Sequence, residues 1–190
     1  KTNQIKEHCM MIVVLKALKL NERNLQICNS VLNIENKCAM HIRIEQDWLN
    51  YSKKKMKSAN FNELYLINTN SLIDLYKNKG FEEDVFFTTG QNQTQVQKQM
   101  LDKDIKSDFI FVNDLEYEVN AAINFELCCR AKLFVGLTRS TFSNLISLKR
   151  DLADKNNSYI YNLNDQLYVR VDKGLHPCPK NAIHNHVEIV

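Results

Sequence analysis

The segment that decides the fold reads Cys38-Ala39-Met40-His41-Ile42-Arg43-Ile44-Glu45-Gln46-Asp47-Trp48. Its first half is a nearly continuous apolar run, which is typical of a strand covered on both faces. His41 and Arg43 interrupt the run two positions apart, so an extended strand would place both on one side of its pleat. The segment therefore predicts a buried strand that carries polar side chains toward one end.

Arg43 is costly inside such a strand, because burying an unpaired charge costs several kcal/mol. One explanation is an internal partner, for which Glu45 and Asp47 are the obvious candidates. The other is the phosphate of a ligand at the carboxyl end of the strand, where open α/β sheets bind their ligands. The spacing alone favours neither explanation.

Outward from this strand, apolar strands alternate with amphipathic helices. On its amino-terminal side, Met10–Leu18 predicts a strand or a short buried helix, and Asn21 predicts the N-cap of a helix that reaches Asn33. On its carboxyl-terminal side, Tyr51–Lys57 is a basic surface loop or helix, and a helix capped near Asn70 or Ser71 stops at Gly80. The elements expected after that are strand Val85–Gly90, helix Gln91–Leu101, strand Phe109–Val112, helix Glu116–Lys132, strand Leu133–Gly136, helix Ser140–Asp154, and strands Tyr159–Tyr161 and Leu167–Val171. Strand–helix–strand repeats with short connections predict an α/β fold with a doubly wound parallel sheet of Rossmann type.

Composition narrows the class of protein. At 190 residues, 44% hydrophobic and 25% charged, residues 1–190 are most simply one globular domain. A formal charge of +3 is too weak to indicate nucleic acid or an anionic membrane as a partner. The longest apolar run, Met10–Leu15, is far shorter than the roughly 20 residues of a membrane span.

The six cysteines indicate the cellular setting. Several lie in apolar stretches and none forms a CxxC pair, which favours reduced, buried thiols in a cytoplasmic protein over a disulfide framework. His176, Cys178, His184 and His186 are zinc-ligand types, but their spacing matches no common zinc finger. We therefore expect no metal and a surface tail at this end.

A second informative loop reads Gly136-Leu137-Thr138-Arg139-Ser140-Thr141-Phe142-Ser143-Asn144. It follows a predicted strand and places hydroxyls at the start of the next helix. Backbone N–H groups, the helix dipole and hydroxyls together form an anion site. The alternative is that Ser140 or Thr141 is simply an N-cap. Neither a Walker loop nor a GxGxxG is present, so we expect no dinucleotide cofactor.

Two phosphate-competent loops on one sheet edge suggest a diphosphate, and a nucleotide sugar fits that. With that in view, His41-Ile42-Arg43-Ile44-Glu45-Gln46-Asp47-Trp48 resembles the HxRIxxDW segment of the protein O-fucosyltransferase family. Arg139-Ser140-Thr141-Phe142-Ser143, with Lys149-Arg150-Asp151 downstream, is similar to that family's STFS loop and helix end. The resemblance extends from about Leu18 to Asp151.

The resemblance implies the C-terminal, donor-binding half of a GT-B glycosyltransferase that is inverting and independent of metals and cofactors. Arg43 would contact the β-phosphate of the donor and stabilise the leaving nucleoside diphosphate. The implied donor is GDP-fucose first and a rhamnose donor second, and the acceptor is a glycan or protein hydroxyl. The residues implied in donor binding are His41, Arg43, Trp48, Asn124, Arg139, Ser140, Thr141, Phe142 and Ser143. The candidate base for the acceptor hydroxyl is Glu45 or Asp47.

The chain departs from this family in three respects. Glu45 stands where the family has glycine, and it either offers a carboxylate near the reacting centre or pairs with Arg43. Asn124 stands where the superfamily often has aspartate, which affects base recognition. The chain is also too short for both GT-B lobes, so we expect one domain of a longer polypeptide; a virus-encoded multidomain glycosyltransferase would fit.

Two other functional classes remain open. A non-catalytic nucleotide- or phosphosugar-binding module would keep the same phosphate loops without transferring a sugar. A plain α/β scaffold would pair Arg43 internally with Glu45 and bind no nucleotide. Trp48 likewise either stacks on a sugar or is a core anchor.

Overall fold

The computed structural model describes residues 12–58, 69–137, 140–163, 166–171 and 174–177. A short helix covers residues 12–17. The helices that follow are α2 (Glu22–Ser30), the 3-10 helix η1 (Ile34–Asn36), α3 (Gln46–Ser58), α4 (Thr69–Asn78), α5 (Gln93–Leu101), α6 (Tyr117–Arg130) and α7 (Thr141–Asp151). The strands are β1 (Cys38–His41), β2 (Val85–Thr88), β3 (Ser107–Asp108), β4 (Leu133–Leu137), β5 (Ser158–Leu163), β6 (Gln166–Val171) and β7 (Gly174–Pro177).

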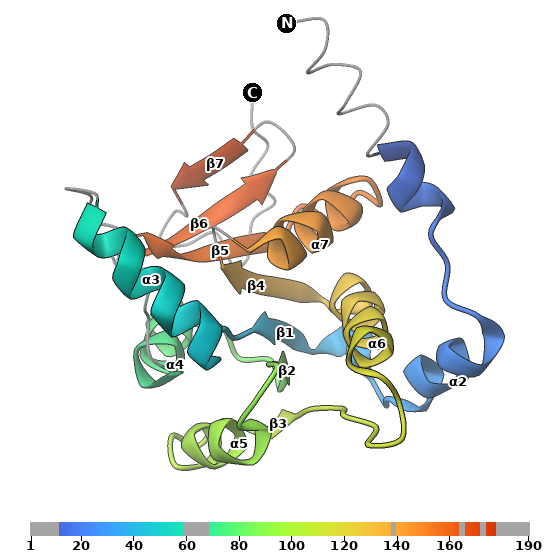
Figure 1. The fold of residues 1–190 in the computed structure, drawn as a ribbon, viewed down its shortest axis with the longest axis horizontal. Coiled ribbons are helices and arrows are strands. Elements are labelled where there is room, and N and C mark those ends of the chain that lie inside the picture. Colours follow the sequence, from blue (N-terminus) through green and yellow to red (C-terminus); the bar gives the residue numbers. More distant parts are fainter. Residues whose placement is uncertain (1–11, 59–68, 138–139, 164–165, 172–173, 178–190) are drawn as a thin grey trace, which may run out of the picture.

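The strands form one sheet in the order β3-β2-β1-β4-β5-β6-β7 (Figure 1). The first five in this order are parallel, whereas β6 and β7 are antiparallel. The predicted α/β, doubly wound, Rossmann-type fold is therefore confirmed.

Helices cover both faces of this sheet. On one face, Cys38 and Met40 of β1 join a core with residues of α3, α4 and α5. On the other face, Ala39 between them packs with residues of α2, α6 and α7. Because successive side chains of a strand point to opposite faces, this alternation places the segment at the centre of a two-sided core.

Local sequence signals set several helix ends. Asn21 accepts a hydrogen bond from Asn24 N–H at 2.9 Å, which confirms it as the N-cap of α2. Gly80 adopts the left-handed region, with φ 72°, just beyond the end of α4, as expected of a glycine that stops a helix. The start of α4 lies at Thr69, slightly before the predicted cap at Asn70 or Ser71.

Other expectations are corrected. Phe109–Val112 is not a strand; the edge strand β3 consists of Ser107–Asp108 alone. Gly174–Pro177, expected in a surface tail, forms β7 against β6. The segment at residues 12–17 is a helix, but Val13 and Val14 are exposed rather than buried.

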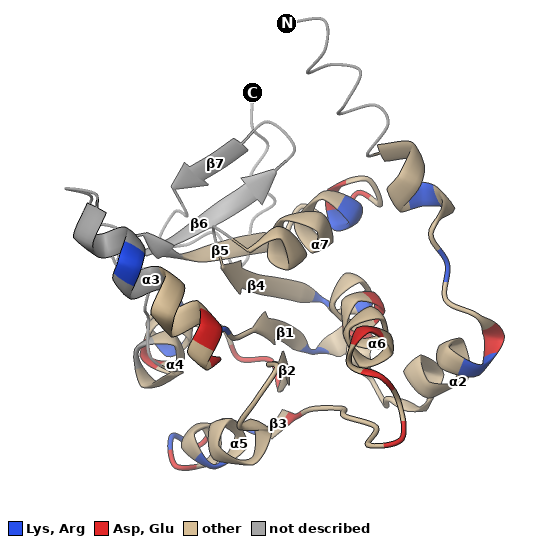
Figure 2. Ribbon diagram, in the orientation of Figure 1, with Lys and Arg blue, Asp and Glu red and all other residues tan. Residues whose placement is uncertain are grey.

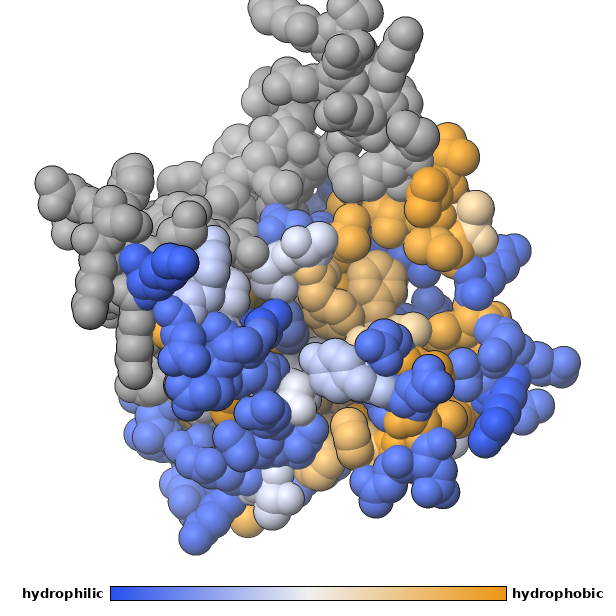
Figure 3. All heavy atoms as spheres, in the orientation of Figure 1, coloured by the Kyte–Doolittle hydropathy of each residue, from blue (hydrophilic) through white to orange (hydrophobic). Residues whose placement is uncertain are grey.

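The surface mixes both charges. Figure 2 shows positive and negative residues side by side where β1 passes into α3. Figure 3 shows hydrophobic residues gathered where Figure 1 places the helix of residues 12–17. Within the described residues, no helix has the length and apolar character that crossing a bilayer requires.

Candidate functional site

The strand order reverses direction between β1 and β4. From β1 the chain proceeds outward to β2 and β3, and it then returns to place β4 and β5 on the other side of β1. Parallel strands share one carboxyl edge, and the crevice at such a reversal is where open α/β sheets bind ligands. The loops after β1 and β4, singled out from the sequence, lie at this reversal.

His41 joins the two loops. It is the last residue of β1, and its Nδ1 lies 2.7 Å from Ser143 Oγ of α7. The same Ser143 oxygen accepts a hydrogen bond from Leu137 N–H at 3.0 Å. On the backbone side, the Tyr161 hydroxyl donates to the His41 carbonyl at 2.9 Å. The ring of Phe142 lies 4.8 Å from the imidazole, which completes the packing.

The imidazole of His41 is neutral at pH 7. Burial, with the positive charge of Arg43 acting in the same direction, lowers the pKa of His41 from 6.5 to about 3. One nitrogen of a neutral imidazole accepts a hydrogen bond, and Ser143 Oγ, which accepts from Leu137 N–H, still has its own proton to donate. We assign the Ser143 hydroxyl as donor to Nδ1, which leaves the ring proton on Nε2.

The start of α7 is closely packed. Ser140 is its N-cap and accepts from Ser143 N–H at 3.3 Å, so the N-cap interpretation is confirmed. Ser140 and Ser143 are buried, whereas Thr141 is exposed and Phe142 half-buried. Thr141 is the exposed residue of this first turn, and the leading N–H groups of a helix have no intrahelical acceptor.

Gly136 permits this packing. A Cβ at this position would lie 2.7 Å from Ser143 Oγ and 2.7 Å from Phe134 Cε1, closer than such atoms approach. The glycine therefore lets the start of α7 lie against β4, where Ser143 reaches His41. The sequence interpretation noted Gly136 only as the start of a loop. Arg139, predicted in the same loop, lies outside the described residues.

Arg43 lies beyond the end of β1 rather than within a strand, and its side chain is 25% exposed. Glu45 Oε2 lies 2.9 Å from Arg43 Nε, and Asp47 Oδ2 lies 3.3 Å from Arg43 Nη2. The ring centroid of Trp48 lies 5.0 Å from the guanidinium carbon, within cation–π range. Arg43 thus has both of its predicted internal partners, and Trp48 is buried beneath it as a core residue.

His41 and Arg43 do not share one side of a strand. His41 contacts Ser143 and Phe142 of α7, on one face of the sheet. Arg43 contacts Trp48, whose ring belongs to the core of the opposite face. The prediction of a common side fails because extended pairing stops at His41, and the chain then turns into α3.

Asn124 lies apart from these contacts, on α6. Its side-chain NH₂ group donates to the Asn120 carbonyl at 2.9 Å and to the Ile110 carbonyl at 3.3 Å. Its Oδ1 is buried and has no hydrogen-bond partner among the described residues. The next residue, Phe125, packs edge-on against Phe142 at 5.7 Å, which is the nearest described link to the site.

Two contacts at the site carried no recognisable sequence signal. Glu45 Oε1 accepts from Gly90 N–H at 2.6 Å and so joins the loops after β1 and β2. The Tyr161 hydroxyl reaches the end of β1 from β5. Both contacts depend on which strands are neighbours, and residue spacing does not contain that information.

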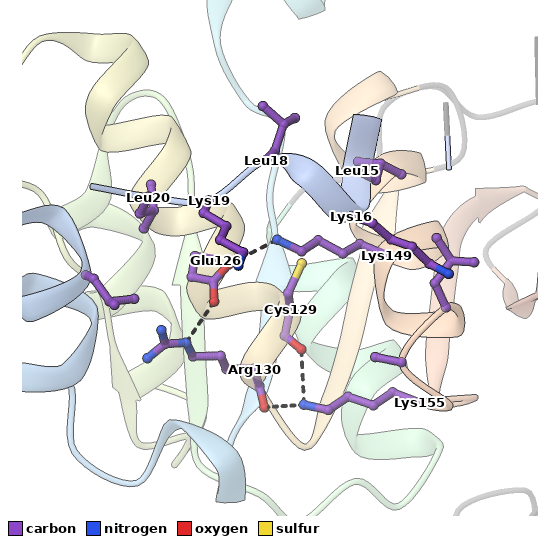
Figure 4. Close-up of a pocket in the computed structure, with 13 residues that line it drawn as sticks. Leu15, Lys16, Leu18, Lys19, Leu20, Glu126, Cys129, Arg130, Lys149 and Lys155 are labelled. Carbon is purple, nitrogen blue, oxygen red and sulfur yellow. Dashed lines mark hydrogen bonds and ion pairs between the residues drawn. The ribbon is translucent and has the colours of Figure 1, made fainter. Parts of the chain in front are cut away.

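A separate cavity of about 510 Å³ lies between residues 15–20 and the outer surface of α6 and α7 (Figure 4). It has apolar walls and a basic rim, in which Lys149 and Arg130 both pair with Glu126. Its lining residues come from the carboxyl-terminal ends of α6 and α7, whereas the site lies at the start of α7. Among the described residues, no three His, Cys, Asp or Glu side chains gather as a metal site requires.

The comparisons with known proteins concern the fold and the sequence as a whole. No family model matches the chain. O-fucosyltransferase 23 of Arabidopsis thaliana is 27% identical over 162 residues, which covers 66% of this chain and 35% of that protein.

Solved structures of POFUT1 share the fold. The complex with GDP-fucose matches with a TM-score of 0.55 and 15% identity over 73% of this chain and 45% of POFUT1. The apo form matches with a TM-score of 0.57 and 16% identity over 76% and 47%, respectively. The chain thus spans about a third of the plant relative and less than half of POFUT1.

Proposed function

We propose that this chain is the nucleotide-sugar-binding part of a glycosyltransferase, with GDP-fucose as the first candidate donor. The observation that carries the proposal is the meeting of two loops at the reversal of strand order, one with Arg43 and one with the start of α7. The similarity to a plant O-fucosyltransferase and the fold shared with POFUT1 support it.

In this proposal Arg43 acts on the leaving group. A guanidinium forks onto two phosphate oxygens, and its stabilisation of the diphosphate increases as charge develops there. The outer turn of α7, with Thr141 and its leading N–H groups, would hold the second phosphate. The acceptor hydroxyl attacks the anomeric carbon as the bond to the β-phosphate oxygen breaks, with inversion and without a metal ion.

The proton of the acceptor hydroxyl needs a base. Both oxygens of Glu45 face internal partners, whereas the side chain of Asp47 is 76% exposed. We therefore favour Asp47 as the base. When Arg43 turns to phosphate, the carboxylate of Asp47 is released beside the sugar.

A thermal-shift panel of GDP, UDP, GDP-fucose and UDP-rhamnose tests the donor site. A ligand at 100 times its Kd stabilises the fold by about 2.7 kcal/mol, which raises the melting temperature of a protein of this size by several degrees. We expect this shift with GDP and GDP-fucose, and its loss in Arg43→Ala. The matched control is Arg23→Ala, which removes an exposed arginine of α2 and should keep the shift.

Absence of a shift with every nucleotide, or an equal shift in Arg43→Ala, would contradict the proposal. Hydrolysis of GDP-fucose in the absence of acceptor then separates an enzyme from a binding module. A slow release of fucose supports the enzyme, and binding without release supports the module.

A further inference from the structure

The two carboxylates beside Arg43 differ in their surroundings. The side chain of Glu45 is 9% exposed, whereas that of Asp47 is 76% exposed. Glu45 Oε2 lies beside the buried Nε of the guanidinium, and Asp47 Oδ2 lies beside Nη2. One partner is therefore fixed within the fold, and the other lies in solvent, where an ion pair contributes little.

Glu45 is held by a second loop. Its Oε1 accepts the Gly90 N–H at 2.6 Å, across 45 residues of chain. A Cβ at position 90 would lie 2.7 Å from that oxygen and 3.1 Å from the Tyr117 hydroxyl. A side chain at position 90 would therefore displace the Glu45 carboxylate from this contact, by which Glu45 joins the arginine loop to the loop after β2.

The contact between Glu45 and Arg43 is electrostatic. Oε2 and Nε lie 2.9 Å apart, but neither makes a hydrogen bond of acceptable geometry with any residue that the structure describes. The guanidinium is therefore held in place by opposite charge and by the Trp48 ring 5.0 Å away. Nε is thus buried beside Glu45, whereas Nη2 meets the exposed carboxylate of Asp47.

We infer that Glu45 is a positioning residue that directs the Nη edge of Arg43 at the diphosphate of the donor, while Asp47 is an exchangeable partner that phosphate displaces. This inference rests on the proposed function. It assigns the two carboxylates opposite effects on binding. Removing the charge of Glu45 releases the guanidinium, whereas removing the charge of Asp47 removes a competitor of phosphate.

Calorimetric titration with GDP tests this assignment. In Glu45→Gln the amide oxygen still accepts from Gly90 N–H, but the charge beside Nε is lost, and we expect Kd to rise about tenfold, which equals about 1.4 kcal/mol. In Asp47→Asn we expect Kd to fall about two- to fivefold, which is under about 1 kcal/mol, while transfer to an acceptor decreases. The two variants are matched, since each changes one carboxylate to its amide.

A double-mutant cycle distinguishes positioning from a general loss of structure. If Glu45 acts through Arg43, then Glu45→Gln changes the Kd of Arg43→Ala by less than about twofold. If Glu45 had only a structural role, Glu45→Gln would weaken GDP binding equally in the wild type and in Arg43→Ala. Hydrogen exchange at the Gly90 amide adds a readout without nucleotide: it should stay slow in Glu45→Gln and become fast in Glu45→Ala.

The outcomes separate this inference from the proposed function. If the wild type binds no nucleotide, both are overturned. If the wild type binds GDP more tightly than Arg43→Ala does, but Glu45→Gln binds as the wild type does, only the inference is overturned. The inference is also overturned if Glu45→Gln weakens GDP binding equally in the wild type and in Arg43→Ala, or if Glu45→Gln binds GDP more tightly than the wild type.

Discussion

At His41, burial and the neighbouring Arg43 charge act in the same direction, because both oppose a second positive charge. The ring is 6% exposed and contacts Ser143. Protonation would add a charge in the interior and remove the acceptor at Nδ1. The neutral imidazole is thus part of what connects β1 to α7.

The stability of the fold should therefore depend on pH through His41. Its pKa falls from 6.5 to about 3 on folding, so the unfolded chain binds the proton more readily. The contribution to the free energy of unfolding is complete above pH 6.5 and is lost as pH falls toward 3. Between pH 7 and pH 5 we expect a loss of about 2 kcal/mol from this group.

Urea denaturation at several pH values checks this expectation. His41→Asn is the informative variant, since its Oδ1 can accept from the Ser143 hydroxyl but does not titrate. In this variant we expect the decrease in the free energy of unfolding between pH 7 and pH 5 to be smaller than in the wild type by about 2 kcal/mol. An unchanged slope would show that His41 is not the group responsible.

Two arginines show how far the burial of a single charged residue could be predicted from the sequence. The cost of a buried charge directed attention to Arg43, which is indeed paired with Glu45 and Asp47 but is 25% exposed. Among the described residues, the arginine that is fully buried is Arg150, at 0% exposure. Its burial follows from the carbonyl groups around it, and those become neighbours only in the folded sheet.

Arg150 of α7 connects this helix to α6 and β5. The guanidinium of Arg150 makes six hydrogen bonds, and their acceptors come from the end of α6, the segment before β4 and the start of β5. Carbonyl groups at a helix end lack intrahelical donors and carry partial negative charge. The acceptors are the carbonyl oxygens of Cys128, Cys129, Ala131 and Lys132 and the side chains of Asn157 and Ser158.

Replacing Arg150 should destabilise this junction strongly. Arg150→Met keeps the volume but leaves several buried acceptors without a donor, and we expect a loss of about 3 to 5 kcal/mol in the free energy of unfolding. Arg130→Met is the control, since Arg130 is a partly exposed residue of α6 that pairs with Glu126, and its loss should cost under about 1 kcal/mol. Chemical denaturation measures both; equal losses would contradict the role of Arg150.

The two segments whose secondary structure was predicted wrongly from the sequence were predicted wrongly for the same reason. Phe109–Val112 has the composition of a strand, but pairing with β2 ends at Asp108, and Asn120 instead bonds the backbone N–H and carbonyl of Val112. Gly174–Pro177 lacks a strand signal, yet it pairs with β6. In both, tertiary contacts override local propensity.

For the molecule as a whole, the two hydrophobic cores share the same strands. Phe86 of β2 and Phe134 of β4 belong to one core, whereas Phe87 and Val135, the next residues, belong to the other. Unfolding of the strands on one face would therefore disrupt the hydrophobic core on the other face as well. The strands shared by both cores thus belong to one structural unit, while one domain over residues 1–190 stays a prediction.

Unfolding should accordingly be a single transition. Trp48, the sole tryptophan, reports on the core next to α3 and α4, while far-ultraviolet circular dichroism reports on all helices. In urea we expect the two curves to coincide. Separate midpoints would show that the two faces of the sheet unfold independently.

The position of β1 also determines the order in which the chain can fold during synthesis. Cys38 pairs with Val85 on one side and with Leu133 on the other. The central strand is thus made early but acquires its second neighbour only after nearly a hundred further residues have been added. Such non-local pairing slows folding and leaves apolar strand edges open in the meantime. A ribosome that pauses before β4 would leave the sheet incomplete and its apolar edges open, so we expect slower translation through the α6 segment to lower the yield of folded protein.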